Sequence, residues 1–178
     1  MPTASVPLLL ITGAPAVGKT AAGEQIRHLL EQAGACFALV DRDEISPDGL
    51  FTEDRLVVLA RCLDKHLAAG ATTLVVVWPL ESSKEIDAFR AALPWADVTV
   101  CRLHAETEVL LDRIAARDDQ TFMAAHLQSM ALDIAPRLQR EAPEDIVVAT
   151  DREPPLRVAG RALVRWRLKE IARPRARV

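Results

Sequence analysis

Residues 13 to 20 read Gly13-Ala14-Pro15-Ala16-Val17-Gly18-Lys19-Thr20 and fit the pattern GxxxxGK[ST] without a mismatch. An apolar run precedes them and a segment of helical period follows, which is the context in which such a loop cradles phosphate groups. The two glycines permit backbone conformations that side chains prevent, so successive N–H groups can point at phosphate oxygens. Pro15 has no N–H. The donors are therefore expected from about Ala16 to Thr20, at the positive end of the helix dipole.

Two side chains of this loop suit ATP and magnesium. Lys19 is expected to reach the terminal phosphates, and the hydroxyl of Thr20 to hold Mg²⁺. The sequence therefore predicts a phosphate loop in which all residues from Gly13 to Thr20 contact the nucleotide, with ATP and Mg²⁺ as cofactors. The alternative, a chance glycine turn before a helix, does not explain why strand, loop and helix occur together.

The rest of the chain alternates short apolar runs with longer segments of helical period, as in parallel sheets joined by crossover helices. Three runs, at 8–11, 74–77 and 146–148, are almost continuously apolar, which suits strands covered on both faces. We predict a single α/β domain over residues 1–178, a three-layer sandwich with a five-stranded parallel sheet. Its strands are expected at about 7–12, 36–41, 72–78, 97–103 and 145–150.

Capping and stop residues mark the expected helix ends. Four residues have the spacing of helix caps: Thr52 and Ser82 at N-termini, Gly34 and Gly70 at C-termini. A helix from about 121 to 132 is expected to stop before Pro136, because proline lacks the N–H that continues a helix. The last helix is expected to begin near Pro155, since proline is favoured at the first helical position.

The composition argues against several partners and locations. The net charge of -3 gives no reason to expect a nucleic-acid partner. No apolar stretch approaches the roughly 20 residues that cross a bilayer, and the run 6–11 passes straight into the phosphate loop, unlike a signal peptide. We therefore expect a cytoplasmic protein without a membrane partner, either a monomer or a homodimer. Its three cysteines, Cys36, Cys62 and Cys101, are expected to be reduced residues of the core.

Size and the absence of asparagine narrow the class of nucleotide-binding protein. Without asparagine the chain lacks the Asn-Lys-x-Asp guanine reader of GTPases, and 178 residues leave no room for the extra modules of a motor or transporter ATPase. With these exclusions the sequence resembles the small P-loop kinases, the group that includes adenylate, shikimate, gluconate, adenylylsulfate and chloramphenicol kinases. The resemblance implies a P-loop NTPase fold of the nucleoside-kinase type and a kinase that uses ATP.

In these kinases the second strand often ends in an acidic residue that faces the acceptor, commonly in an Asp-x-Asp pair. Asp41 and Asp43 fill that place here. The resemblance implies that one of them is the base toward the acceptor, and Asp41 is a candidate to join Thr20 around Mg²⁺. A solvated turn or a pair of helix-capping carboxylates is the alternative.

The stretch 110–117 resembles the segment that leads into the lid of adenylate kinases. By that resemblance Arg113 packs on adenine, Arg117 contacts phosphates, and residues 117 to 140 form the lid. Positions four apart share a helix face, so both arginines could line one nucleotide. Ion pairs with neighbouring acidic residues are the alternative. A weaker match after the fifth strand, from Thr150 to Pro155, resembles the adenine loop and implies contacts from Arg152 and Pro154.

The end of the third strand departs from the family. Where many relatives carry an aspartate that supports Mg²⁺, Val77 is followed here by Trp78, Pro79 and Leu80. The metal would then rely on Thr20, the nucleotide, water and one aspartate of the acidic pair. Ligands of open parallel sheets lie at the carboxyl ends of the strands, so Trp78 is a candidate wall of the acceptor pocket.

Together these features predict a kinase that moves the γ-phosphoryl group of ATP to a hydroxyl of a small molecule. Lys19, Mg²⁺ and Arg117 would neutralise the transferred group, while Asp41 or Asp43 orients the acceptor. Two carboxylates would repel a phosphate, which favours a hydroxyl acceptor, although Arg42 and Arg55 could bind an anionic one. Two alternatives stay open: a nucleoside or nucleotide kinase, and an ATP-binding regulatory module with little turnover.

Overall fold

The computed structural model describes residues 5–45, 54–117 and 122–172. Five strands form one parallel sheet in the order β2-β3-β1-β4-β5. The strands are β1 (Val6–Thr12), β2 (Phe37–Asp41), β3 (Thr73–Val77), β4 (Ala96–His104) and β5 (Ile146–Ala149). The predicted α/β class and all five predicted strands are confirmed, with boundaries within a few residues.

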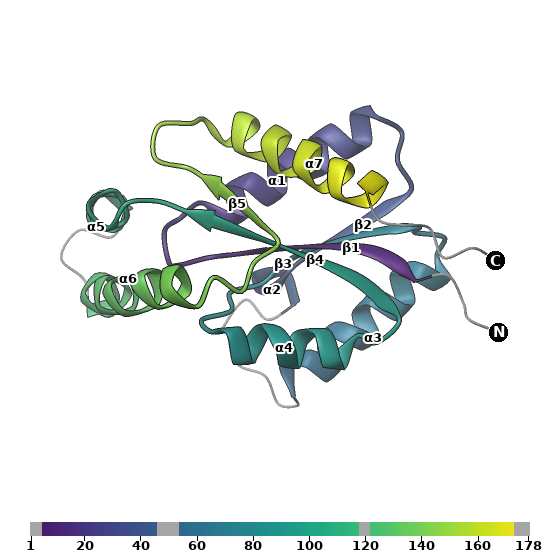
Figure 1. The fold of residues 1–178 in the computed structure, drawn as a ribbon, viewed down its shortest axis with the longest axis horizontal. Helices are drawn as coiled ribbons and strands as arrows, with labels where there is room; N and C mark the ends of the chain where they lie inside the picture. The colour runs from purple at the N-terminus through teal and green to yellow at the C-terminus, as the bar shows by residue number, and fades with distance from the viewer. Residues whose placement is uncertain (1–4, 46–53, 118–121, 173–178) are drawn as a thin grey trace.

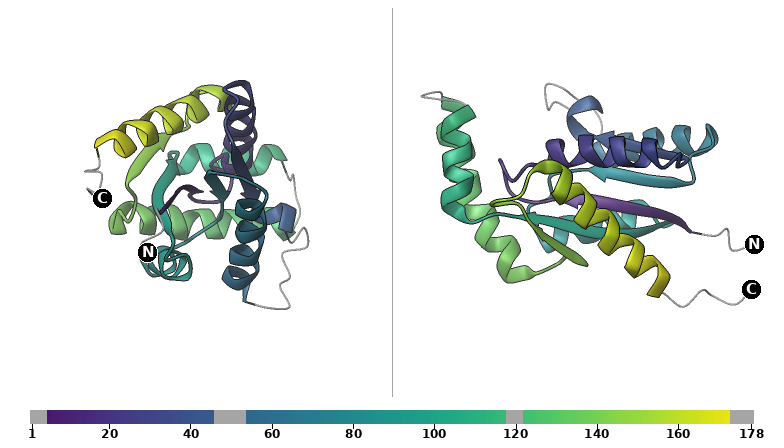
Figure 2. Two further views of the ribbon diagram at one scale, coloured as in Figure 1. Left: turned by 90° about the vertical axis from the view of Figure 1, so that its right-hand side faces the viewer. Right: turned by 90° about the horizontal axis from the view of Figure 1, so that it is seen from above.

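Helices cover both faces of this sheet (Figures 1 and 2). One face carries α1 (Lys19–Gln32) and α7 (Pro155–Ala172), and the other carries α3 (Arg55–Ala68) and α4 (Ser83–Ala92). A short helix, α2 (Arg42–Ile45), directly follows β2. The last two, α5 (Thr107–Arg117) and α6 (Phe122–Glu141), lie beyond the carboxyl ends of the strands. The predicted three-layer sandwich is therefore confirmed.

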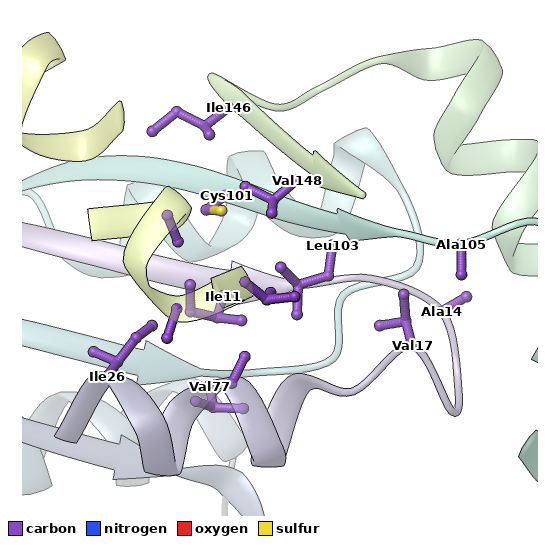
Figure 3. Packing of buried hydrophobic residues seen from close by; sticks show 14 of the residues in the cluster. Ile11, Ala14, Val17, Ile26, Val77, Cys101, Leu103, Ala105, Ile146 and Val148 are labelled. Carbon is purple, nitrogen blue, oxygen red and sulfur yellow. The ribbon is translucent and has the colours of Figure 1, made fainter. Parts of the chain in front are cut away.

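Alternate residues of the strands divide the core into two clusters. Leu9, Ile11 and Val77 belong to the cluster beneath α1 and α7 (Figure 3), whereas Leu10 and Val76 belong to the cluster beneath α3 and α4. All five side chains are at most 2 % exposed. The apolar runs are continuous because both faces of the sheet are buried.

The predicted helix caps are largely confirmed. Gly34 and Gly70 have φ values of 63° and 101°, in the left-handed region that ends a helix. The Ser82 hydroxyl accepts a hydrogen bond from the Glu85 N–H at 3.3 Å, and α7 begins at Pro155. Thr52 lies outside the described residues. The cap of α3 is instead Asp54, whose side chain accepts from the Leu56 N–H at 2.8 Å.

Two expectations about the chain are wrong. Helix α6 does not stop before Pro136 but continues through it to Glu141. Ile134 and Leu138, on either side of the proline, are 3 % and 1 % exposed. Burying two such side chains contributes roughly 3 to 6 kcal/mol, which offsets the roughly 3 kcal/mol that an internal proline costs. Cys36 is also not a core residue but exposed, because β2 begins only at the next residue.

The other two cysteines fit the expectation better. Cys62 is partly buried and Cys101 is fully buried in β4, where burial raises the pKa of its thiol to about 12. Such a thiol stays protonated at neutral pH. No helix in the described part of the chain is both long and apolar enough to span a lipid bilayer.

Candidate active site at the phosphate loop

The loop from Gly13 to Gly18 joins the central strand β1 to helix α1. Gly13 and Gly18 have φ values of 141° and 96°, which side chains rarely adopt. A Cβ at Gly13 would also lie 2.5 Å from the Leu103 carbonyl oxygen of β4, so this position needs glycine for space as well. Ala14 and Val17 are buried against Ala105 and the end of β4 (Figure 3). The loop is therefore seated firmly on the sheet.

The N-terminus of α1 opens directly from this loop. Its hydrogen bonds begin where the Ala22 N–H donates to the Gly18 carbonyl at 2.9 Å. The N–H groups of Lys19, Thr20 and Ala21 precede that bond and have no acceptor within the helix. A helix start of this kind binds anions through its free N–H groups and its dipole. The geometry is the one the sequence pattern predicts for a phosphate loop.

The Lys19 side chain folds over the loop. Its Nζ donates to the carbonyl oxygens of Gly13 at 3.0 Å and of Ala14 at 2.9 Å. Burial lowers the pKa of Lys19 to about 8, and the charge of Arg42 adds to this effect. Asp41, Asp43 and Glu81 act in the opposite direction. The ammonium group therefore interacts with one cation and three carboxylates, all from the segments at or just after the ends of β2 and β3.

Asp41 is the last residue of β2 and lies opposite Val77 of β3. Val77 in turn lies opposite Ile11 of the central strand β1, so Asp41 is two strands away from the start of the phosphate loop. It is only 7 % exposed, and burial raises the pKa of its carboxyl group. Its Oδ1 accepts a hydrogen bond from the Asp43 N–H at 3.0 Å, so Asp41 caps α2. A hydrogen bond with Thr20 also favours the ionised form of Asp41. The structure thus brings together the two side chains predicted to hold Mg²⁺.

Asp43 lies in the first turn of α2 and is exposed. Its Oδ1 forms an ion pair with the Arg42 guanidinium, 2.7 Å from Nη2. Asp41 and Asp43 line one cavity of about 270 Å³ next to the start of α1. The described residues that line it are Thr20, Gly23, Glu24, Arg27, Leu39, Asp41, Asp43 and Glu44. This cavity is the candidate place for an acceptor.

The oxygen ligands at this place fit magnesium. Within the described residues no group of three or more His, Cys, Asp or Glu side chains converges to hold a metal ion by itself. Mg²⁺ at phosphoryl-transfer sites keeps several waters and is bound by one or two carboxylates together with substrate phosphates. Thr20 and Asp41 provide a hydroxyl and a carboxylate of this kind.

Arg113 links the phosphate loop to the loop after β5. Its Nη2 donates to the Thr150 carbonyl at 2.6 Å, and its Nη1 to the Thr150 hydroxyl at 3.1 Å. The same Nη1 lies 3.5 Å from the carbonyl oxygens of Ala16 and Val17. The predicted adenine-binding arginine therefore lies beside both segments predicted to contact the nucleotide. Its guanidinium also has a structural role, because it ties the two loops together.

The remaining predicted contacts lie further out. Arg117 is exposed at the last residue of α5, and Arg152 and Pro154 are exposed between β5 and α7. Trp78 is fully buried in the core cluster beneath α3 and α4 and does not line the cavity, so its interpretation as a pocket wall is wrong. The backbone N–H of Trp78 donates to the Ile11 carbonyl at 3.0 Å, so the sheet pairing continues to this residue.

Sequence reasoning missed Glu81. The three residues directly after β3, Trp78, Pro79 and Leu80, include no acid, and Glu81 follows them. These three residues bring its charge close to Lys19 and to Arg137 of α6. An acidic residue within four positions of the strand end was the signal that could have identified it.

Comparisons with known proteins agree with this geometry. No protein-family model matches the chain, and no curated protein matches it by sequence. Solved structures do match over nearly their full length. A gluconokinase from Sinorhizobium meliloti 1021 has a TM-score of 0.63 at 22% identity, covering 95% of this chain and 97% of its own.

Two further structures give the same result. A tunicamycin resistance protein from Deinococcus radiodurans has a TM-score of 0.66 at 15% identity, covering 97% of this chain and 99% of its own. A shikimate kinase from Acinetobacter baumannii, in complex with shikimate, has a TM-score of 0.58 at 18% identity, covering 96% and 97%. The chain therefore has the fold of the small P-loop kinases, as its phosphate loop and acidic strand end predict.

Proposed function

We propose that this protein is an ATP-dependent kinase that transfers the γ-phosphoryl group to a hydroxyl of a small molecule. The observation that carries the proposal is the cavity in which Thr20, Asp41 and Asp43 meet beside the phosphate loop. A phosphate donor held at the loop would face an acceptor that is held by carboxylates. Phosphoryl transfer needs this juxtaposition, because catalysis there is mostly positioning and charge stabilisation.

Each residue near the loop has a role in this proposal. The N–H groups of the loop and of the first turn of α1 bind the phosphates, and Lys19 turns from its carbonyl partners toward the terminal phosphate. Arg117 adds a second positive charge to the transferred group. Arg113, Arg152 and Pro154 hold the adenine. Bound Mg²⁺, next to Thr20 and Asp41, would neutralise negative charge on the phosphates.

The acceptor is bound on the acidic side of the site. Asp41 or Asp43 accepts the hydrogen bond of the acceptor hydroxyl and takes its proton as the phosphoryl group arrives. Asp41 is fixed by the sheet and by its bond to the Asp43 N–H, whereas Asp43 extends from α2 into the cavity. Which of the two is the base is a question for separate variants.

The cations near the cavity favour a neutral hydroxylated acceptor over a nucleoside monophosphate. Arg42 pairs with Asp43, and Arg55 pairs with Glu85 at 2.9 Å. Arg27, the one cation among the described residues that line the cavity, pairs with Glu44 at 2.8 Å. An anionic acceptor would have to break such pairs and then meet the remaining carboxylates. Two structural neighbours are named for gluconate and shikimate, which are polyhydroxylated but carry a carboxylate, so neutral sugars and polyols are tested first and these two acids serve as the anionic comparison.

The test is ADP formation from ATP with and without a panel of hydroxylated acceptors, including nucleosides. A kinase produces acceptor-dependent ADP, and the product is the phosphorylated acceptor identified by mass spectrometry. The Lys19→Ala variant is the control for contaminating kinases. If ATP binds but no acceptor stimulates ADP formation, the regulatory-module alternative replaces the kinase. If a nucleoside or nucleotide is the acceptor, the preference for a neutral sugar-like compound is wrong.

A further inference from the structure

The turn after β3 places a carboxylate beside the phosphate loop. The Leu80 N–H donates to the Thr12 hydroxyl at 3.0 Å, and that hydroxyl lies 3.4 Å from the Leu80 carbonyl. Thr12 is the residue directly before Gly13, and both Thr12 and Leu80 are buried. The backbone at Leu80 is therefore fixed to the last residue before the loop. Glu81 is the first charged residue beyond β3, and its side chain is partly exposed.

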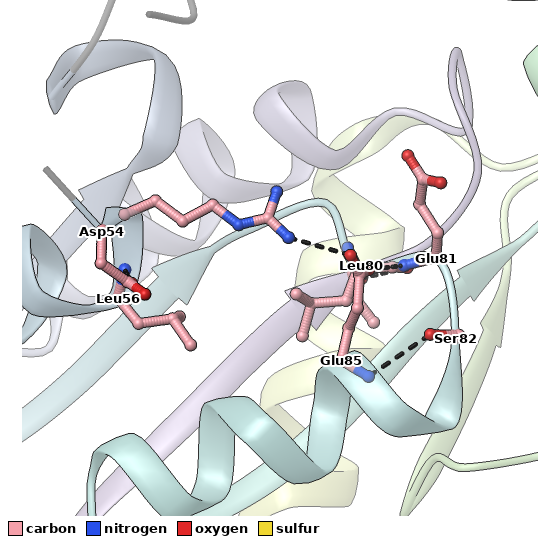
Figure 4. A network of polar contacts seen from close by, with 8 residues as sticks. Asp54, Leu56, Leu80, Glu81, Ser82 and Glu85 are labelled. Carbon is pink, nitrogen blue, oxygen red and sulfur yellow. Dashed lines mark hydrogen bonds and ion pairs between the residues drawn. The ribbon is translucent and has the colours of Figure 1, made fainter. Parts of the chain in front are cut away.

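The backbone of Glu81 is fixed from the other side as well. Its N–H donates to Oε2 of Glu85 at 2.7 Å, while Oε1 of Glu85 pairs with Arg55. The Ser82 cap holds the Glu85 backbone in turn. Figure 4 shows the Glu81 side chain extending away from Glu85 and from α4, toward the loop that follows β1. The fixed backbone therefore holds the start of this side chain on the side of the phosphate loop.

The Glu81 carboxylate itself is left available. Within residues 5–45, 54–117 and 122–172 its oxygens form no hydrogen bond or ion pair, although its charge acts on Lys19 and on Arg137. A half-buried carboxylate in this position would repel the phosphates of a nucleotide. Positive charge between the two offsets that repulsion, and a bound cation would add to the charge that Lys19 already supplies there.

We propose that Glu81 is a second carboxylate of the magnesium site, acting through the hydration shell of the ion in addition to Thr20 and Asp41. This inference rests on the proposed use of ATP. In the described part of the chain Glu81 does not belong to a group of three or more His, Cys, Asp or Glu side chains that could hold the ion by themselves. A contact through water suits Mg²⁺, which keeps much of its hydration shell. The turn from Trp78 to Glu81 thus supplies the acid that the end of β3 lacks.

The experiment measures how strongly Mg²⁺ enhances ADP binding. The dissociation constant of ADP is determined by calorimetry in EDTA and in saturating Mg²⁺, and the ratio of the two is the magnesium enhancement. We expect Glu81→Gln to lower this enhancement by about tenfold, the effect usual for groups that contact a metal's ligands rather than the metal. ADP affinity in EDTA should be equal or higher, because a negative charge near the phosphates is removed.

Two matched variants accompany it. Glu81→Asp keeps the carboxylate and should restore part of the enhancement. Glu31→Gln removes an exposed carboxylate near the C-terminal end of α1, about 18 Å along the helix from Lys19, and should leave the enhancement unchanged. An unchanged enhancement in Glu81→Gln overturns the proposal. Equal weakening in EDTA and in Mg²⁺ also overturns it, since Glu81 would then act on Lys19 alone. Failure of the wild type to bind ADP at all would instead refute the proposed function.

Discussion

The phosphate loop has two sides that differ in how they are held. On the sheet side, Asp41 and Glu81 follow neighbouring parallel strands, and backbone hydrogen bonds fix both. On the helical side, α5 and α6 lie beyond the strands, and Arg117 is exposed at the end of α5. Hydrogen bonds between parallel strands fix the position of a residue at a strand's end. A residue at the end of a helix is held by side-chain packing instead and can move more easily. The sheet side is therefore suited to fixed chemistry and the helical side to closure.

One residue joins the two sides. The Arg113 guanidinium, on α5, contacts Thr150 and approaches the carbonyls of Ala16 and Val17. The part of α5 up to Arg113 is thus tied to the loop. We expect variants of the sheet side to change the chemistry, with the largest effect at Lys19, and bound nucleotide to change hydrogen exchange on the helical side, with the smallest effect.

The largest effect is expected for Lys19→Ala. The substitution removes the one loop side chain that carries charge to the terminal phosphates, and two hydrogen bonds to loop carbonyls with it. We expect ATP turnover to fall by on the order of 1000-fold, since loss of a single stabilising donor already costs about 100- to 1000-fold. Steady-state ADP formation and the melting temperature are measured together. Normal turnover in the folded variant would refute the phosphate-loop assignment.

Asp41→Asn and Asp43→Asn separate the two acids of the sheet side. Each keeps the shape but removes the charge, so loss of the base should lower acceptor phosphorylation by about 100-fold or more. Of the two, the Asp41 variant should also lower the Mg²⁺ enhancement of ADP binding, because Asp41 forms a hydrogen bond with Thr20. ATP affinity in EDTA is the control and should change little. Full phosphorylation by both variants would show that the pair only caps α2.

The pH dependence of nucleotide binding reports on Lys19. Burial and Arg42 lower its pKa from 10.5 to about 8 in the free protein, so the ammonium loses its proton as the pH rises through 8. Bound phosphates favour the charged form, so binding takes up a proton above pH 8. ADP affinity should fall by about tenfold between pH 7 and pH 9, as linkage requires. Calorimetry in two buffers of different ionisation enthalpy measures the proton uptake, and a flat profile with no uptake would contradict the assignment.

The same shift has a consequence for folding. The folded state disfavours the charged form of Lys19, so this lysine opposes folding below pH 8. Its unfavourable contribution is relieved as the pH rises from about 8 toward 10.5. The sign is opposite to that of a lysine stabilised by an ion pair. Burial of the charged Lys19 thus lowers the free energy of unfolding at the place where the phosphate is proposed to bind.

The features that followed from the sequence are those set by local pattern. Glycine spacing identifies the loop because only glycine suits the backbone at Gly13 and Gly18, and apolar runs identify strands because both sheet faces are buried. Asp41 was found because it is the last residue of a strand. Each of these signals lies within a few adjacent residues.

What was missed depends on contacts between distant segments. Glu81 reaches the loop only because Leu80 bonds to Thr12, which is 68 positions away in the chain. Helix α6 passes through Pro136 because the sheet buries residues on both sides of it, and Trp78 turns into the core rather than toward the cavity. Neither local propensity nor periodicity contains this information.

The last prediction concerns the lid of residues 117 to 140, which stays a prediction. Residues 118–121 lie outside the described residues, and α6 begins at Phe122. Ala131, Ile134 and Leu138 belong to the main core cluster and are at most 3 % exposed, so the second half of α6 cannot leave the sheet without opening the core. In the first half of α6 the small Ala124 also belongs to that cluster, whereas Met123 in the first turn is 55% exposed. We therefore expect closure to involve the segment from Arg117 to about Met130.

Hydrogen exchange in that segment should slow several-fold when ADP and Mg²⁺ are added, whereas residues 131 to 141 should be protected with and without nucleotide. Equal exchange throughout α6 in both states would show that the helical side is as rigid as the sheet side.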